Sequence, residues 1–330
     1  MPELRYNPLL GNWTMVAANR QTRPHLPNGD CPFCPGSGKV PENYDVHIYD
    51  NDFPALMPNP PEPAETGSGL YRTAPSYGKC EVVLYSPKHE ATLHQLSVEH
   101  LEKVIDLWTE RFVELGKAPH NEYVMIFENR GRECGVTMPH PHGQIYAYPD
   151  VPLKIRTELD NCRIHHESTG SCLLCDMNRE EQAFTQRVIH ENEHFLAYLP
   201  FFTDYPYGLF IVSKTHKTGL SDFSPEERRA LAEMLKDMTG TMDALFEKLF
   251  PYMMVLHQRP VNGEDVEDYY HFHIEFYTPL RDADRIKFYA SSEMGAWAAC
   301  NPSAVEDTAE QLRDAYKRYL HKRKEGEAHE

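Results

Sequence analysis

The stretch HPHGQIYAY at residues 140–148 decides the fold, because HFHIEFY at residues 271–277 repeats its pattern. Both stretches contain two histidines one residue apart, followed by alternating polar and apolar or aromatic residues, which is typical of a strand. Alternate residues on a strand share one face. We therefore expect His140, His142 and Gln144 to project together into one site, and we expect Gly143 to let a substrate approach the backbone.

The same order of elements precedes each of these stretches. It consists of a Cys-x-x-Cys pair, an apolar run that ends in a histidine, an amphipathic segment, and an apolar strand. In the first half these are Cys31/Cys34, residues 81–85 with His89, residues 98–115, and residues 123–127; in the second they are Cys172/Cys175, residues 209–212 with His216, a segment from Ser224, and residues 252–256. Repetition of this kind predicts two units of the same structure, which we assign to residues 1–160 and 161–330.

Each half is predicted to hold one long helix among short strands. Apolar residues from Val98 to Leu115 recur at helical spacing. A second helix is predicted to begin at the capping box of Ser224 and Glu227. Strands are predicted at 123–127, 143–148, 194–199, 209–213, 252–256 and 271–278, a last helix at about 303–320, a surface loop at 54–78, a junction at 150–170, and a frayed tail at 322–330. The fold class is α+β with a mostly antiparallel sheet and helices packed on it.

Composition excludes several classes of protein. The 330 residues include 50 acidic and 33 basic side chains, for a formal net charge of −17. Nucleic-acid binders need clustered positive charge, so we expect no nucleic-acid partner. The sequence has no apolar run of membrane-spanning length, and its start lacks the pattern of a secretory signal. We therefore expect a cytoplasmic protein without a membrane partner.

Two matched sets of cysteine and histidine predict metal binding. The first set is Cys31, Cys34, His89 and His140, and the second is Cys172, Cys175, His216 and His271. Two thiolates with two imidazoles suit tetrahedral zinc, and free thiols are stable in a reducing compartment. A metal at His140 would fix His142 for chemistry without touching the substrate.

The two halves differ where chemistry would occur. His273 takes the place of His142, but Glu275 takes the place of Gln144. A carboxylate would repel a phosphoryl oxygen, whereas an amide NH₂ can donate to it. The reacting site is therefore expected in the first half.

This constellation resembles the galactose-1-phosphate uridylyltransferase family of the histidine triad superfamily over nearly the whole chain. The sequence FENRG at 127–131, followed nine residues later by HPHGQ, matches the family's active-site signature. The resemblance implies two tandem histidine-triad-like repeats, with the sheet forming a half-barrel. It also implies a homodimer, with sites shared between subunits.

The resemblance implies a ping-pong reaction of the Leloir pathway of galactose metabolism. His142 would attack the α-phosphorus of UDP-glucose and release glucose 1-phosphate. Galactose 1-phosphate would then take the uridylyl group from His142. The chemistry is reasonable, because a neutral imidazole is nucleophilic near pH 7 and its phosphoryl adduct is a good donor.

Substrate contacts follow from the matched motifs. Gln144 is expected to hold phosphoryl oxygens, together with the loop from Gly131 to Thr137. The full predicted binding set is Arg20, Arg23, Asn51, Asp52, Phe53, Asn129, Arg130, Gly131, Gly135, Thr137, Lys287 and Glu293. Three positions depart from the family: Thr137 replaces a serine, Ser292 a common tyrosine and Ala299 an expected glutamine. The last two would contact the hexose, so its identity stays open.

Alternatives remain for the second metal and for the function. Some family members bind the second metal through residues equivalent to Glu158, His257, His271 and His273. We favour the cysteine set because it mirrors the first one, with zinc or iron as its metal. The alternative functions are a related phosphorylase acting on ADP-glucose or another nucleotide sugar, and a zinc-stabilised binding module without catalysis.

Overall fold

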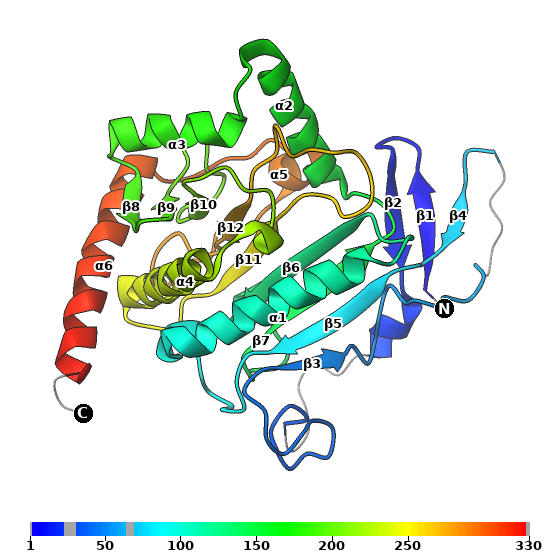
Figure 1. Cartoon of the computed structure of the whole chain (residues 1–330), viewed down its shortest axis with the longest axis horizontal. Helices are drawn as coiled ribbons and strands as arrows, with labels where there is room; N and C mark the ends of the chain where they lie inside the picture. The colour runs from blue at the N-terminus through cyan, green and yellow to red at the C-terminus, as the bar shows by residue number, and fades with distance from the viewer. Residues whose placement is uncertain (1, 23–30, 64–68, 328–330) are drawn as a thin grey trace.

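The structure, a computed structural model, describes residues 2–22, 31–63 and 69–327. In this part of the chain, nine antiparallel strands form one open sheet (Figure 1). Their spatial order is β3 (His47–Asp50), β5 (Lys79–Leu84), β7 (His142–Tyr148), β6 (Tyr123–Arg130), β11 (Tyr252–His257), β12 (His273–Tyr277), β10 (Phe210–Ser213), β9 (Phe195–Tyr198) and β8 (Val188–Glu191). A second, three-stranded sheet consists of β2 (Asn12–Val16), β1 (Glu3–Asn7) and β4 (Thr73–Pro75).

The predicted repeat is visible in the large sheet. The order β5-β7-β6 of the first half matches β10-β12-β11 of the second, and the halves meet where β6 pairs with β11. In each half the second histidine of the motif lies opposite an apolar residue of the neighbouring strand, Leu84 opposite His142 and Val212 opposite His273. The predicted α+β class with a mostly antiparallel sheet is confirmed, and the sheet is continuous across both halves.

Helices cover one face of this sheet. Figure 1 shows α1 (Val98–Gly116) and α4 (Pro225–Phe246) lying side by side over the strands, with α6 (Val305–Glu327) beside α4. The predicted capping box is confirmed: the Ser224 hydroxyl accepts from the Glu227 amide at 3.2 Å, and the Glu227 carboxylate accepts from the Ser224 amide at 2.8 Å. One core beneath the helices draws on both halves, including Trp108, Ile145 and Ile274. Strand alternation therefore sends Gln144 and Glu275 to the opposite face.

Several elements differ from the sequence prediction. The expected junction at 150–170 is largely the helix α2 (Leu153–Thr169), and α3 (Leu173–Phe184) follows it. α2 buries only Ile155 and Cys162, so its sequence lacks an apolar stripe that would have predicted a helix. α6 extends to Glu327 instead of ending near residue 320, and the proline-rich region contains β4.

The remaining elements are short. They are α5 (Ser291–Ala296) and the 3-10 turns η1 (Ala18–Thr22), η2 (Leu93–Gln95), η3 (Arg132–Cys134) and η4 (Leu220–Asp222). Within the described ranges, every helix is too short or too polar to cross a bilayer.

A buried ion pair joins the end of β6 to α4. The guanidinium of Arg130 donates to both carboxylate oxygens of Asp243, each at 2.7 Å. Asp243 also accepts from the backbone amide of Phe250 at 2.8 Å. Arg130 and Asp243 have 8% and 18% of their side chains exposed, so removing one partner leaves a poorly solvated charge.

Replacement of Asp243 by alanine is expected to lower the free energy of unfolding by about 3 kcal/mol, because the Arg130 charge loses its partner. Urea unfolding followed by circular dichroism measures the change. The matched control is Glu114→Ala, which removes an exposed pair with Lys117 and is expected to cost less than about 1 kcal/mol. Equal changes in the free energy of unfolding for the two variants would show that the buried pair stabilises the fold no more than the exposed pair does.

Candidate active site and metal centres

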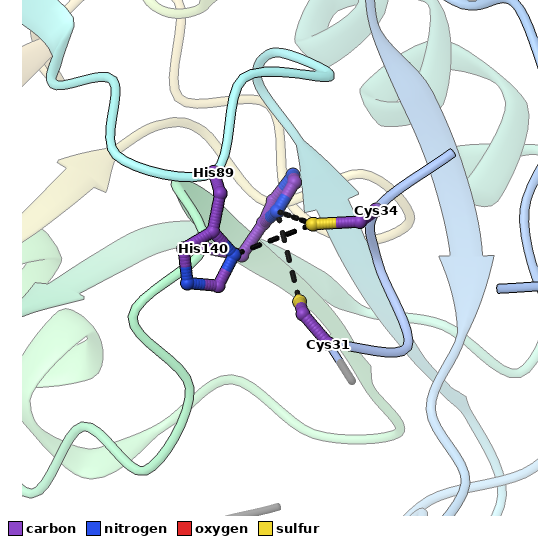
Figure 2. A group of neighbouring side chains, drawn as sticks. All are labelled: Cys31, Cys34, His89 and His140. Carbon is purple, nitrogen blue, oxygen red and sulfur yellow. Dashed lines mark hydrogen bonds between the residues drawn. The ribbon is translucent and has the colours of Figure 1, made fainter. Parts of the chain in front are cut away.

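The first predicted metal set assembles from three separate segments. Cys31 and Cys34 lie on one turn, His89 follows β5, and His140 precedes β7 (Figure 2). The Nδ1 atom of His140 lies 3.7 Å and 3.6 Å from the two sulfurs, and Nδ1 of His89 lies 3.4 Å from Sγ of Cys34. Tetrahedral zinc with ordinary bond lengths places sulfur and nitrogen about 3.6 Å apart. The set therefore fits a zinc ion.

Hydrogen bonds fix the orientation of the His140 ring. The ring is fully buried, and its Nε2–H donates to the carbonyl of Ser86 at 2.8 Å. The hydroxyl of Tyr44 lies 3.1 Å from the same nitrogen and donates to the carbonyl of Phe33 at 2.7 Å. This arrangement leaves the lone pair of His140 on Nδ1, the atom that faces the thiols, as outer-sphere contacts commonly do for metal ligands.

His142 starts β7 and lies outside the metal sets found among the described residues. Its Nδ1–H donates to the carbonyl of His140 at 2.7 Å. The lone pair of the neutral ring is therefore on Nε2, which suits a nucleophile. The geometry connects the two rings, since the residue that supplies a metal donor also fixes the tautomer of its neighbour.

Gly143 is required for a different reason from the predicted one. A Cβ atom at this position would lie 2.0 Å from the hydroxyl of Tyr85 and 3.0 Å from the carbonyl of Phe127. Tyr85 belongs to the core beneath the helices. Glycine at position 143 thus makes room for the side chain of Tyr85. The expectation that the missing side chain makes room for a substrate was wrong.

Gln144 and Asn129 lie on the same sheet face as His142. Gln144 is two residues from His142 on β7 and lies opposite Phe127 of β6. Asn129 shares a face with Phe127, because it is two residues further along the same strand. The two amide side chains therefore flank the face on which His142 lies.

A cavity of about 620 Å³ opens beside His142. Its walls include Asn129, Gly131, Thr137, His140 and the 3-10 turn η3. Gly131 and Gly135 have φ angles of 86° and 76°, which place them in the left-handed region that favours glycine. Such a loop can present backbone amides to an anion.

The cavity wall also contains a buried carboxyl group, Glu128, to which the sequence analysis gave no role. Burial raises the pKa of this carboxyl to about 7. The hydroxyl of Tyr252 donates to it at 3.2 Å. Its place in FENRG made it visible in the sequence, but its burial between β strands and helices could not be inferred from that motif.

The N-terminal binding residues lie near the same face but outside the cavity wall. Arg20 donates to the hydroxyl of Tyr146 at 3.1 Å, and Tyr146 follows Gln144 by two residues on β7. Asn51 caps a turn after β3 by accepting from the amide of Phe53 at 2.9 Å, and Asp52 accepts from the hydroxyl of Tyr49 at 2.8 Å. Arg23 lies outside the described residues.

Three predicted substrate residues form ion pairs. Arg130 lines the cavity, and its guanidinium pairs with Asp243 on the helix side of the sheet. Lys287 donates to Glu293 at 2.7 Å, and this hydrogen bond lowers the pKa of Glu293 to about 2. Lys287 and Glu293 are absent from the cavity wall.

The second predicted metal set also assembles. Nδ1 of His271 lies 3.6 Å from the sulfur of Cys172 and 3.4 Å from that of Cys175, and Nδ1 of His216 lies 3.6 Å from Cys175. The Nε2–H of His216 donates to the carbonyl of Glu267 at 2.6 Å. The distances match those of the first set, so this set equally fits a tetrahedral metal.

The alternative second set does not form as the sequence suggested. His271 joins the cysteines, whereas Glu158, His257 and His273 gather with Glu275 instead. Lys154 and Tyr277 also contact this group, and the sequence analysis missed both. Lys154 lies on α2 and Tyr277 on β12, 123 residues apart in sequence, so no local motif could have predicted their contact.

Comparison with known proteins places the chain in a family. Residues 1–152 match the family described as galactose-1-phosphate uridyl transferase, N-terminal domain, and residues 158–325 match its C-terminal domain. The chain is 41% identical to galactose-1-phosphate uridylyltransferase from Thermotoga maritima, over 95% of this chain and 98% of the relative.

Solved structures agree with this assignment. A uridylyltransferase structure superposes with a TM-score of 0.89 at 33% identity, covering 96% of this chain and 99% of the other. An ADP-glucose phosphorylase from Arabidopsis thaliana with bound ADP-glucose superposes less closely, with a TM-score of 0.74 at 26% identity and coverages of 95% and 99%. The predicted resemblance is confirmed: the chain belongs to the galactose-1-phosphate uridylyltransferase family of enzymes.

Proposed function

We propose that this enzyme exchanges a uridylyl group between UDP-glucose and galactose 1-phosphate through a covalent adduct on His142. The observation that carries the proposal is the hydrogen bond from Nδ1–H of His142 to the carbonyl of His140 at 2.7 Å. This hydrogen bond places the lone pair of the neutral His142 ring on Nε2, and His142 lines the cavity in which a substrate would bind. Family membership supports the choice of substrates.

The reaction proceeds in two displacements at phosphorus. In the first, Nε2 of His142 forms a bond to the α-phosphorus of UDP-glucose, and the bond from that phosphorus to the bridging oxygen breaks. Glucose 1-phosphate leaves with the bonding electrons. The proton stays on Nδ1 of His142, which remains hydrogen-bonded to the His140 carbonyl. In the second, a phosphate oxygen of galactose 1-phosphate attacks the adduct and returns the electron pair to Nε2. Splitting one exchange into two steps lowers the barrier for each.

The surrounding residues position the substrate. In this proposal Gln144 and Thr137 donate to phosphoryl oxygens, aided by backbone amides of Gly131 and Gly135. Asn129 binds the leaving or entering phosphate. Asn51 and Asp52 bind ribose or phosphate, and Phe53 also contacts the substrate. Arg20 and Arg23 supply positive charge for the anionic sugar phosphate. Support comes from the shared sheet face and from the loop geometry beside His142.

The metals are structural in this proposal. A zinc ion held by Cys31, Cys34, His89 and His140 would supply rigidity at His140, with zinc or iron held by Cys172, Cys175, His216 and His271. Free thiols in both sets favour a reducing, cytoplasmic location. Residues 1–160 would then carry the reacting site, and residues 161–330 the second metal.

We further propose a homodimer in which Lys287 and Glu293 of one subunit complete the site of the other. Their absence from the cavity wall of their own chain supports this arrangement. Large apolar side chains lie exposed near them, since Phe288, Met294 and Trp297 are 79%, 67% and 64% exposed. Exposed apolar groups of this size mark interaction surfaces.

A phosphorylase acting on ADP-glucose is the second candidate, because the Arabidopsis thaliana relative covers 95% of this chain. A non-catalytic zinc-stabilised module is the third. Turnover of UDP-glucose compared with ADP-glucose separates the first two candidates, and the partial reaction described next excludes or supports the third.

The double displacement predicts isotope exchange without an acceptor sugar. Labelled glucose 1-phosphate mixed with UDP-glucose and the enzyme is expected to enter the UDP-glucose pool, because the first step is reversible. His142→Ala is expected to reduce the exchange rate by at least about 10³-fold, as for other covalent nucleophiles. Chromatography of the nucleotide sugars measures the label.

Two variants sharpen this test. Gln144→Glu reproduces the residue found at Glu275, and its carboxylate is expected to slow exchange by at least about 10²-fold through repulsion of the phosphoryl group. His321→Ala, on the exposed face of α6, is the matched control and is expected to exchange at the normal rate. Exchange that survives in His142→Ala would rule out the covalent mechanism.

The first metal set predicts a separate result. Cys34→Ser is expected to lower the zinc content by one ion per chain and to slow isotope exchange by about 10- to 100-fold, although Cys34 does not line the cavity. Metal analysis by mass spectrometry gives the content. Cys300→Ser changes an exposed cysteine outside both sets and should leave the zinc content unchanged. An unaltered zinc content in Cys34→Ser would refute metal binding at this set.

A further inference from the structure

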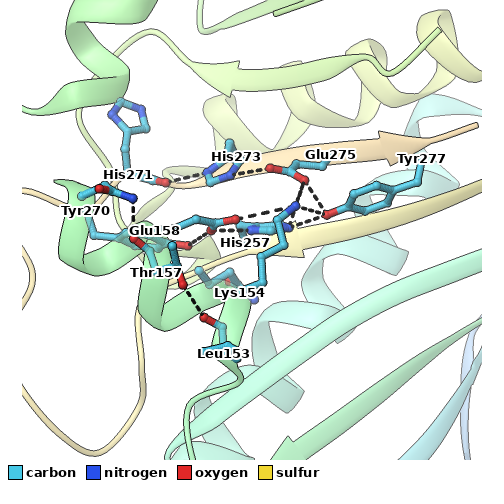
Figure 3. A network of polar contacts seen from close by, with 12 residues as sticks. Leu153, Lys154, Thr157, Glu158, His257, Tyr270, His271, His273, Glu275 and Tyr277 are labelled. Carbon is cyan, nitrogen blue, oxygen red and sulfur yellow. Dashed lines mark hydrogen bonds and ion pairs between the residues drawn. The ribbon is translucent and has the colours of Figure 1, made fainter. Parts of the chain in front are cut away.

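A third polar cluster lies between α2 and the sheet of the second half. Glu158 of α2, His257 of β11, and His273 and Glu275 of β12 bring their donor atoms within 4.8 Å of one another (Figure 3). Two imidazoles and two carboxylates could ligate a divalent metal. His257, His273 and Glu275 are buried, so two nearby carboxylates need a compensating positive charge.

The contacts within this cluster differ from those of the two cysteine sets. Nδ1–H of His257 donates to the Glu158 carboxylate at 2.8 Å, and Nε2 of His257 lies 3.1 Å from the hydroxyl of Tyr277. Nδ1–H of His273 donates to the carbonyl of His271 at 3.0 Å. Both nitrogens of His257 are therefore engaged at hydrogen-bond distances, whereas sulfur and nitrogen in the cysteine sets stand at the separation set by a tetrahedral metal.

An ammonium group already lies among the carboxylates. Nζ of Lys154 lies 2.5 Å from one oxygen of Glu275, 3.7 Å from one oxygen of Glu158 and 2.8 Å from the hydroxyl of Tyr277. Figure 3 shows the Lys154 side chain reaching from α2 toward this group. Half of the side chain is exposed, but its charged end contacts the two acids.

His271 cannot complete a metal site here. Its Nδ1 faces the two thiols of the second set, and its Nε2 lies 2.9 Å from the hydroxyl and 3.0 Å from the carbonyl of Ser213. Both ring nitrogens are therefore engaged away from Glu158. The cluster retains four possible ligands of its own, and the ammonium of Lys154 contacts both of their carboxylates.

We propose that the ammonium of Lys154 is the resident cation of this cluster, and that Glu158, His257, His273 and Glu275 form a latent divalent-metal site that Lys154 keeps closed. A metal ion that entered the native cluster would be repelled by the ammonium of Lys154 unless it displaced that side chain. A cavity of about 330 Å³, lined by Lys154, Glu158, His273 and Glu275, gives an ion a route to the donors. Removal of the ammonium therefore exchanges one cation for another.

Cobalt binding tests the proposal. Lys154→Met, which keeps a long side chain without charge, is expected to bind one more Co²⁺ per chain than the natural protein. The added ion should give visible d–d absorption without the sulfur-to-cobalt charge-transfer band that the cysteine sets produce. Lys154→Arg keeps the cation and is expected to bind the natural number. Lys154→Met that folds and binds no added cobalt would overturn the latent site.

A second set of variants decides the question in the natural background. Glu158→Gln and His257→Asn are expected to leave the metal content of the purified protein unchanged, whereas Cys175→Ser should lower it by one ion per chain. A loss of one ion in Glu158→Gln would mean that a metal, and not Lys154, occupies the cluster. This measurement decides the identity of the resident cation even if Lys154→Met fails to fold, and it does not depend on transferase activity.

Discussion

The orientation of the His140 ring is the constraint on which the reacting site depends. Its Nε2–H is fixed by the Ser86 carbonyl and its Nδ1 faces two thiols, so the ring cannot turn without breaking both contacts. Its own carbonyl then accepts from His142 and leaves the lone pair of the neutral His142 ring on Nε2. In the proposed mechanism, metal binding and catalysis are thus connected through the backbone of His140.

The two halves have a histidine at equivalent positions, His142 and His273, but they differ in the charge of the residue two positions later. His142 and His273 lie on corresponding strands of one continuous sheet, and each ring donates from Nδ1 to the carbonyl two residues before it. The first is followed by a neutral amide at Gln144. The second is followed by Glu275, whose carboxylate is held by Lys154. The same backbone geometry therefore supports an internal ion network in the second half and, in the proposed mechanism, phosphoryl chemistry in the first.

Sequence reasoning succeeded where a local pattern determines the contact. Strand alternation, the capping box at Ser224 and the two Cys/His sets are encoded by short motifs and by their repetition. It could not give the ion-pair partners of side chains when those partners lie far away or carry no motif. The motif that contains Arg130 gives no sign of Asp243, which lies 113 residues later, and the position of Lys287 gives no sign that Glu293 holds it on its own subunit. Lys154 was missed because α2 has no apolar stripe and its role depends on β12.

Covalent labelling of His142 is the most direct measurement. The enzyme is mixed with UDP-glucose labelled in the α-phosphate, without galactose 1-phosphate, and the labelled residue is located by peptide mass spectrometry. The transferase mechanism predicts acid-labile label on His142 that disappears when galactose 1-phosphate is added. A protein that stays unlabelled, or that carries the label on another residue, would contradict it.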